Sequence, residues 1–438
     1  MRKLLNQFSL NIIFTQRLWQ GLAGLFTLFF LTQYLSLELQ GWYYSFLSLA
    51  ALYTIFDLGL SAALVQISAH SFVRNQWLGK GDLIGETRDQ FHGLLGQSTQ
   101  LYLVLSIFFC LFFIPIGLYF FGQTSPQQEV LVFAWQWPWV CLILATGLNI
   151  LMLPFLALIE GSGRIYEVYA LRLLQGVIGS IGCWVVLMMG GALWALVVVP
   201  FITFMVTIIW LVTTMPKLLP HAWTRNKLRF DWANEIWPLQ WRIGISWLSG
   251  YFLAQIYTPI LFHFQGASVA GQMGLSLAIA NMLGLLAQSW IALRVPVMAQ
   301  AVGRKDWVFF DHVFKHNFKV SIVVYLLGAA LVCGVHYVLS STSYSNRILP
   351  LMPFVGLLLV VFINHINGAL AAQLRSYKKE PLVWVSFCGT FLTVPVAFFM
   401  ASVYSVGGVV LAILLVQLTI TLPLSTYLWI KYNKKWRE

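Results

Sequence analysis

A succession of long apolar runs constrains this chain more than any other feature of its sequence. An α-helix needs about 20 mostly apolar residues to cross the hydrocarbon core of a bilayer. Twelve runs of about that length follow one another along the 438 residues. They cover residues 11–36, 41–67, 97–121, 130–156, 166–189, 191–214, 239–262, 268–293, 316–338, 348–372, 382–403 and 407–430. The runs predict twelve transmembrane helices.

The composition agrees with a multi-pass membrane protein. Charged residues make up 9% of the chain and apolar residues 59%, whereas a soluble domain carries about 25% charged residues. A water-soluble fold of this length would lack the polar surface it needs. The first run is too long for the apolar core of a signal peptide, so no cleavable signal peptide is expected. Several boundaries fall at Pro126, Gly190-Gly191, Pro216, Pro238, Pro381 and Gly407-Gly408.

The basic residues predict the orientation of the helices. With the amino terminus in the cytoplasm, one outer connection holds Arg347 and no other basic residue lies on that side. The cytoplasmic segments and termini then hold Arg2, Lys3, Arg74, Lys80, Arg88, Arg164, Lys217, Arg225, Lys227, Arg229, Arg304, Lys305, Lys315, Arg375, Lys378, Lys379, Lys431, Lys434, Lys435 and Arg437. This follows the positive-inside rule. Because the net charge of +12 is spread over many short segments, it does not indicate nucleic-acid binding.

The two halves of the chain repeat one another. "LGKGD" (78–82) and "VGRKD" (302–306) lie 224 residues apart, and "TQRLWQG" (15–21) and "QWRIG" (240–244) place Arg17 opposite Arg242 at an offset of 225. Asn149 and Asn364 are 215 residues apart. These matches predict two parallel six-helix repeats about an axis normal to the membrane. We expect a bundle over 1–214, a cytoplasmic linker over 215–238, and a bundle with a short cytoplasmic tail over 239–438.

Two stretches resemble a known family. "LSLELQGWYYSFLSLAALYTIFDLGLSAALVQISAH" (35–70) and "ASVAGQMGLSLAIANMLGLLAQSWIALRVPVMAQAVGRKD" (267–306) resemble matching parts of Wzx-type polysaccharide flippases. This family belongs to the multidrug/oligosaccharidyl-lipid/polysaccharide exporter (MOP) superfamily. The resemblance implies an all-α fold of two six-helix bundles, related by pseudo-two-fold symmetry, around a central cavity. It implies a flippase of the cell inner (cytoplasmic) membrane that moves a lipid-linked (polyprenyl-diphosphate) oligosaccharide by alternating access during polysaccharide biosynthesis. The expected partners are this glycan, membrane lipids, and a polysaccharide polymerase with its assembly proteins.

Four arginines are candidates for binding such a substrate. Arg17 lies about 9 Å into the first predicted helix from its cytoplasmic end. It either extends its side chain to the headgroups or binds a phosphate in the cavity, and the equivalent Arg242 favours the second interpretation. A guanidinium suits a diphosphate because it donates to two oxygens at once. Arg172 and Arg294 lie near the cytoplasmic edge, where topology alone also explains them.

Polar residues inside the predicted spans are candidates for coupling or gating. Asp57 lies deep in the second span, where an ionised carboxylate usually faces a partner or a water-filled cavity. It either pairs with Arg17 or responds to a coupling ion. Asn364, His365 and Asn367 form the most polar patch of any span. They either form hydrogen bonds between helices or provide a titrating gate at His365.

No catalytic or metal-binding pattern occurs in the sequence. The motifs H-E-x-x-H and G-x-S-x-G and a phosphate-binding P-loop are absent. The five cysteines lie far apart in apolar runs and are interpreted as small apolar residues. Glu160 and Arg164 flank "GSG" and are expected to form a surface pair. We therefore expect neither an enzyme nor a cofactor or metal site.

Two rival functions remain open from the sequence. A drug/cation antiporter of the same fold would need an acidic cavity, whereas embedded arginines outnumber the one embedded acid, Asp57. A membrane glycan polymerase or ligase would need a large external loop, and the outer connections are no longer than about a dozen residues. Both features favour the flippase.

Overall fold

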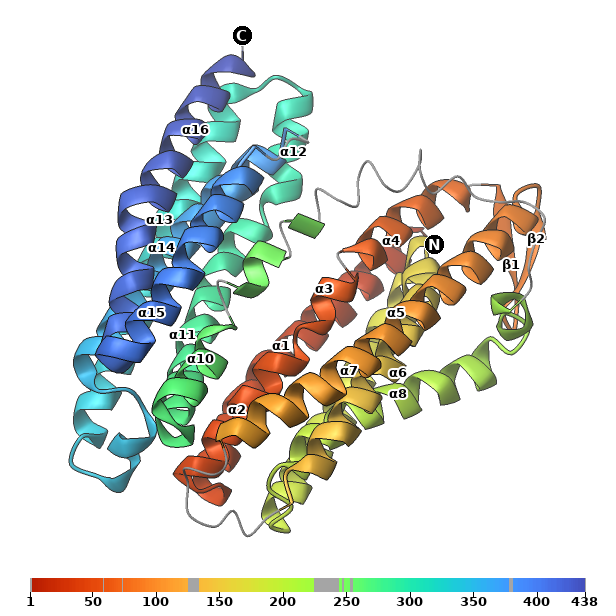
Figure 1. Ribbon diagram of the computed structural model, residues 1–438. Helices are drawn as coiled ribbons and strands as arrows, with labels where there is room; N and C mark the ends of the chain where they lie inside the picture. The colour runs from red at the N-terminus through yellow and green to blue at the C-terminus, as the bar shows by residue number, and fades with distance from the viewer. Residues whose placement is uncertain are drawn as a thin grey trace. The chain divides into compact units, whose positions relative to one another are not determined.

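The computed structural model describes residues 2–57, 59–72, 74–124, 134–223, 244–245, 248–252, 255–377 and 381–437. Helices account for most of these residues (Figure 1), as the apolar runs predict. Among the described residues, eight helices are long and apolar enough to cross a membrane. The count rises to nine if Leu37–Asp57 and Leu60–Ala69, which meet at a bend of 42°, form one broken span. The chain is an all-α, multi-pass membrane protein.

The chain forms two compact units. The first comprises Met1–Ser36 and Leu49–Leu248, and the second comprises Leu37–Ser48 and Ser249–Glu438. A short segment of the N-terminal half therefore belongs to the C-terminal unit.

The first unit packs around one central helix. Its elements are α1 (Arg2–Tyr34), α3 (Tyr53–Asp57), α4 (Leu60–Ser71), β1 (Asn75–Gly79), β2 (Asp82–Gly85), α5 (Arg88–Thr124), α6 (Gln136–Gly161), α7 (Ile165–Met188), α8 (Trp194–Thr214) and the short η2 (Leu219–Ala222). Helix α6 contacts α4, α5 and α8. In its apolar 18-residue stretch, 72% of the residues are buried within the protein. Helix α1 packs on α7, where Trp184 donates a 2.9 Å hydrogen bond to Thr27.

The second unit packs around α11 and α14. Its elements are α2 (Leu37–Ala50), of which residues 37–48 belong here, α10 (Tyr257–Gln265), α11 (Ala267–Ala292), α12 (Val295–Gly303), α13 (Trp307–Leu339), η4 (Ser343–Arg347), α14 (Leu351–Arg375), α15 (Val383–Val416), the π-helical η5 (Gln417–Thr421) and α16 (Leu422–Lys435). Tyr257, Phe354 and Ala397 lie in its core, almost fully buried.

A break at Ser405 separates the last two spans. Its backbone (φ 57°, ψ −152°) is not helical, although helix α15 continues on both sides. The predicted boundary at Gly407-Gly408 lies two residues further on. The apolar stretch from Val383 to Lys435 thus consists of two helical arms, as predicted.

The first three turns of α2 are held tightly in the second unit. The side-chain amide of Gln40, which is fully buried, donates to the carbonyls of Gly271 (2.9 Å) and Arg347 (3.1 Å). A Cβ atom at Gly41 would lie only 1.8 Å from the carbonyl oxygen of Ala267. The two helices can approach this closely only because position 41 is glycine.

A β-hairpin occupies a connection for which the sequence predicted no regular structure. Strands β1 and β2 pair Asn75 with Gly85 and Trp77 with Leu83, and Figure 1 shows them at the end of the first unit. Trp77 Nε1 donates to Ser162 Oγ (3.2 Å), and the backbone amide of Lys217 donates to Lys80 (3.2 Å). The hairpin therefore joins the α6–α7 turn to the segment that follows α8.

The two copies of the loop motif take different structures. "LGKGD" contains the hairpin turn, with Gly79 and Gly81 at positive φ. "VGRKD" instead ends α12 at Gly303 and starts α13, whose first turn is capped by Asp306. The motifs agree in position along each half but not in local structure.

Candidate functional site

Asp57 is a buried carboxylate with three hydrogen bonds. It lies at the end of α3 with 4% of its surface exposed. Tyr102 Oη, from α5, donates to Oδ1 at 2.6 Å, and the Ser61 hydroxyl donates to Oδ2 at 2.8 Å. The backbone amide of Ser61 also donates to Oδ1 at 3.2 Å. Each carboxylate oxygen therefore has a donor.

The sequence "DLGLS" produces this arrangement locally. Gly59 adopts a left-handed conformation (φ 71°) and precedes the first residue of α4. The chain can therefore restart a helix just after α3, which leaves the Ser61 amide in the first turn without an intrahelical partner. The Asp57 carboxylate accepts from this amide and lies near the positive end of the helix dipole, which favours a negative charge.

The expected ion pair between Asp57 and Arg17 is not formed in the described part of the structure. The hydrogen-bond partners of Asp57 are Ser61 and Tyr102, both uncharged. The carboxylate is held by a helix break and a tyrosine. These hydrogen bonds stabilise the buried carboxylate, because a buried charge without hydrogen bonds is strongly unfavourable.

Arg17 is exposed on α1. An adjacent face of the helix, which includes Gln16, is buried. Gly21 and Gly24 follow Arg17 at helical spacing, and a Cβ atom added at either would have no neighbour within 4 Å. Among the described residues, no carboxylate lies within ion-pair distance of Arg17. Arg242, its predicted counterpart, lies outside the described residues.

Arg172 forms an ion pair on the first unit. Its guanidinium lies 2.8 Å from Glu160 and 4.9 Å from the ring centroid of Tyr169. Arg164 instead pairs with Glu167 at 2.9 Å. The expected pair between Glu160 and Arg164 is therefore replaced by two others, Glu160 with Arg172 and Arg164 with Glu167.

Arg294 differs from Arg172 in its surroundings. It occupies the N-cap position of α12, between α11 and α12, and its side chain is exposed.

The polar patch of α14 forms hydrogen bonds with two neighbouring helices. His365, which is buried, has Nε2 3.1 Å from Ser321 Oγ of α13. Asn364 Oδ1 accepts from Gln417 Nε2 at 2.9 Å. Gln417 begins the π-helical turn η5, a type of turn that is frequent at functional sites.

Some polar atoms of this patch have no hydrogen-bond partner among the described residues. They are His365 Nδ1, both amide atoms of Asn367, and Gln417 Oε1, all of which are buried. Interhelical bonding thus accounts for Asn364 and for one nitrogen of His365. The second ring nitrogen remains available for a water molecule or a proton.

The structure adds residues that the sequence did not single out. Tyr102 and Ser321 lie in apolar spans and look like ordinary core residues in the sequence. Only the packing of α5 against α3 and of α13 against α14 brings them to Asp57 and His365. No group of three or more His, Cys, Asp or Glu side chains in the described ranges could hold a metal ion.

The chain resembles solved transporter structures over nearly its whole length. A multidrug resistance MATE family transporter of the MOP superfamily, in its inward-facing conformation, matches with a TM-score of 0.64 and 13% identity over 98% of both chains. The eukaryotic MATE transporter AtDTX14 matches with a TM-score of 0.62 and 15% identity, over 100% of this chain and 98% of that one. The chain has the fold of these transporters.

A lipid flippase also matches the fold of the chain. The lipid II flippase MurJ matches with a TM-score of 0.59 and 14% identity, over 97% of this chain and 87% of that one. No family model and no curated protein sequence matches the chain. The predicted fold class is confirmed, since the chain shares the two-lobed, twelve-helix architecture of these transporters. Membership of the MOP superfamily stays a prediction, because these matches share only 13–15% identity with the chain. The Wzx-type subfamily stays a prediction.

Proposed function

We propose that the protein is a flippase that moves a lipid-linked (polyprenyl-diphosphate) oligosaccharide across the membrane by alternating access. The observation that carries this proposal is the exposed guanidinium of Arg17, a few turns inside α1 and beside two glycines that leave space around it. A guanidinium in such a position can donate to two phosphate oxygens. It suits an anionic substrate.

The burial and hydrogen bonding of Asp57 also favour an anionic substrate. A cationic drug would need an accessible carboxylate, whereas Asp57 is 4% exposed and already accepts three hydrogen bonds. The accessible embedded charge is thus positive and the buried one negative. The fold of the chain is compatible with a lipid-linked substrate, because MurJ is a lipid II flippase.

Arg242 is proposed as the second phosphate ligand. The sequence repeat places it at the same point of the second half as Arg17 in the first. Arg294, which is exposed, would add positive charge near the cytoplasmic edge, whereas the charge of Arg172 is offset by its ion pair with Glu160. In this proposal Asp57, His365 and Asn364 serve in coupling or gating and do not contact the glycan.

A drug antiporter is the second candidate, and one observation favours it. Asp57, which accepts a 2.6 Å hydrogen bond from Tyr102, is an embedded carboxylate of the kind that could serve as the coupling group of an antiporter. Two of the three similar structures named above are MATE transporters, one of them described as a multidrug resistance transporter. In that case Asp57 would be the essential charge and Arg17 would be dispensable.

The remaining expectations follow from the flippase proposal. The protein would lie in the cell inner membrane with both termini in the cytoplasm. It would work beside a polysaccharide polymerase and its assembly proteins, and it would catalyse no covalent step.

The test compares two arginines of the same unit. Arg17→Ala is expected to reduce glycan export by roughly ten- to a hundred-fold, since a charge-assisted bond contributes about 1.5–3 kcal/mol, and Arg17→Lys should restore part of it. The control is Arg74→Ala, which removes an exposed arginine from the β-hairpin. The measurement is lipid-linked glycan accumulated in the inner leaflet against glycan outside, at matched protein levels.

The same variants separate the two candidates. Full export by an Arg17→Ala, Arg242→Ala double variant would show that neither arginine binds the substrate. Glycan export that is unchanged when the whole protein is absent would overturn the flippase proposal. Efflux of a cationic dye that survives this double variant and is lost in Asp57→Asn would establish the drug antiporter instead.

A further inference from the structure

Helix α13 is longer than a bilayer requires. Its 33 residues span about 50 Å, whereas the hydrocarbon core is about 30 Å thick. About a dozen residues must therefore lie in the headgroup region or beyond it. The composition of its exposed face shows at which end they lie.

The exposed face of α13 changes from basic to apolar within one turn, between Lys319 and Val323. After the exposed Val308 and Phe309 in its first turn, the exposed face carries basic side chains at helical spacing: His312, Lys315, His316 and Lys319. From the next turn on it is apolar, with Val323 53%, Leu327 67% and Leu331 69% exposed. The apolar part fits lipid chains, so the basic part lies at the edge of the hydrocarbon. We call these four residues the basic face of α13.

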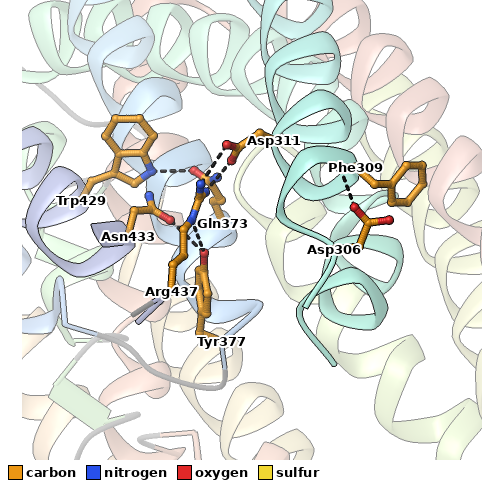
Figure 2. Close-up of polar contacts among 8 residues, drawn as sticks. All are labelled: Asp306, Phe309, Asp311, Gln373, Tyr377, Trp429, Asn433 and Arg437. Carbon is orange, nitrogen blue, oxygen red and sulfur yellow. Dashed lines mark hydrogen bonds and ion pairs between the residues drawn. The ribbon is translucent and has the colours of Figure 1, made fainter. Parts of the chain in front are cut away.

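The two acidic residues near this face, Asp306 and Asp311, form hydrogen bonds with other groups. Figure 2 shows Asp311 pointing toward Arg437, which pairs with both of its carboxylate oxygens. Asp306 accepts a 3.0 Å hydrogen bond from the Phe309 amide at the start of α13. Among the described residues, no carboxylate forms an ion pair with Lys315 or Lys319. The positive charge of the face is therefore not cancelled locally.

Helix α5, the matching helix of the first unit, has no equivalent of this face. Helix α5, which follows the matching loop, has no Lys or Arg after Arg88. Its first turns are covered instead: Phe91 is fully buried and its ring lies 6.0 Å from that of Trp77 in the hairpin. His92 stacks on His221 of η2 at 3.7 Å. The basic face of α13 thus has no counterpart on α5, so it is not a consequence of the repeat.

We propose that the basic face of α13 binds the headgroups of anionic phospholipids. Lysine stems can lie along lipid chains while their ammonium groups reach the phosphates. Each lysine near an anionic surface strengthens attraction about fivefold. This inference goes beyond the proposed flippase function, because it holds whichever substrate the protein moves.

The test uses photoactivatable lipids in vesicles that contain the full-length protein. Two otherwise identical vesicle sets carry a photoactivatable phosphatidylglycerol or a photoactivatable phosphatidylcholine, and attachment sites are mapped by mass spectrometry. In the wild-type protein, residues 308–323 should be labelled several-fold more by phosphatidylglycerol. Lys315→Gln with Lys319→Gln should reduce this excess at least fivefold, and high salt should reduce it as well.

The control removes the same charge at another place in the second unit. Lys434 and Lys435 are exposed at the end of α16, and changing both to Gln should leave the labelling of α13 unchanged. Equal labelling by the two lipids, or an excess that persists in the Lys315/Lys319 variant, would overturn the proposal. So would a segment that neither lipid labels, since a protein partner would then cover the face.

Discussion

The hydroxyl of Tyr102 donates a 2.6 Å hydrogen bond to Asp57, a residue 45 positions earlier in the chain. Both groups are buried, and the bond ties α5 to the break between α3 and α4. The aspartate is thereby part of the packing of the first unit, whatever role it has in transport.

Removing the tyrosine hydroxyl should destabilise the first unit. Tyr102→Phe leaves the buried carboxylate with the two donors of Ser61, at a cost of about 1–3 kcal/mol. We expect a lower melting temperature in detergent for this variant. Tyr34→Phe, on an exposed tyrosine of α1, is the matched control and should melt like the wild type.

A double variant then tests whether the Asp57 carboxylate and the Tyr102 hydroxyl interact. Asp57→Asn in the Tyr102→Phe background should cost less than Asp57→Asn alone, because the shared hydrogen bond is already lost. If the two substitutions lowered the stability additively, Asp57 and Tyr102 would not interact.

Gly41 should be intolerant of a side chain. In Gly41→Ala the new methyl group would collide with the Ala267 backbone, which would have to move away from α2. Such overpacking costs about 1–3 kcal/mol, so we expect a lower melting temperature and less folded protein. Gly24→Ala, where nothing lies within 4 Å of the added atom, is the control. Equal stability of the two variants would show that α2 and α11 are not closely packed.

Acidification should loosen the docking of η2 on α5. Burial lowers the pKa of His221 from its usual value of 6.5, and Arg88 lowers it further, against an opposing effect of Asp82 and Asp89. The undocked residue therefore binds a proton at a higher pH than the docked one. Docking is strongest above about pH 6.5 and weakens as the pH falls from there toward the lower docked pKa.

Hydrogen exchange of residues 215–223, corrected for its intrinsic pH dependence, measures this change. Protection should fall between pH 7.5 and 5.5 in the wild type and fall less in His221→Phe. The ion pair between Lys217 and Asp82 should persist over this range, because the Lys217 hydrogen bond lowers the pKa of Asp82. A wild-type protection that does not change with pH would contradict the prediction.

Both termini and the 215–238 linker should lie on the cytoplasmic side. Within the second unit, Arg375 ends α14 whereas Arg347 precedes its start, so the two sit at opposite ends of one helix. Reporters fused after Arg437 and at Thr224 should both signal from the cytoplasm. An external signal from either one would rule out the twelve-span topology.

The span boundaries were predictable from the sequence because they depend on local chemistry. Gly190-Gly191 marks the end of α7, where Gly190 has φ 77°, and Pro381 precedes α15. Glycine and proline act on the backbone at their own positions, so a single sequence reveals them.

The partners of the embedded polar residues were not predictable in the same way. The sequence favoured Arg17 as the partner of Asp57, but the rotation of α5 brings Tyr102 there instead. The hairpin was also missed, because its short strands are stabilised by contacts with Ser162 and Lys217, which are distant in the sequence. A short two-stranded hairpin has little stability of its own.

The position of residues 37–48 in the second unit has a consequence for biosynthesis. Gln40 leaves the ribosome 231 residues before Gly271 and 307 residues before Arg347, whose carbonyls it binds in the finished protein. At translation rates of about 5–20 residues per second, this interval is on the order of tens of seconds. The start of α2 must therefore remain in the membrane without its final neighbours until the second half has been inserted. A fragment that begins after the linker would lack it, so the C-terminal unit cannot complete its packing as a separate translation product.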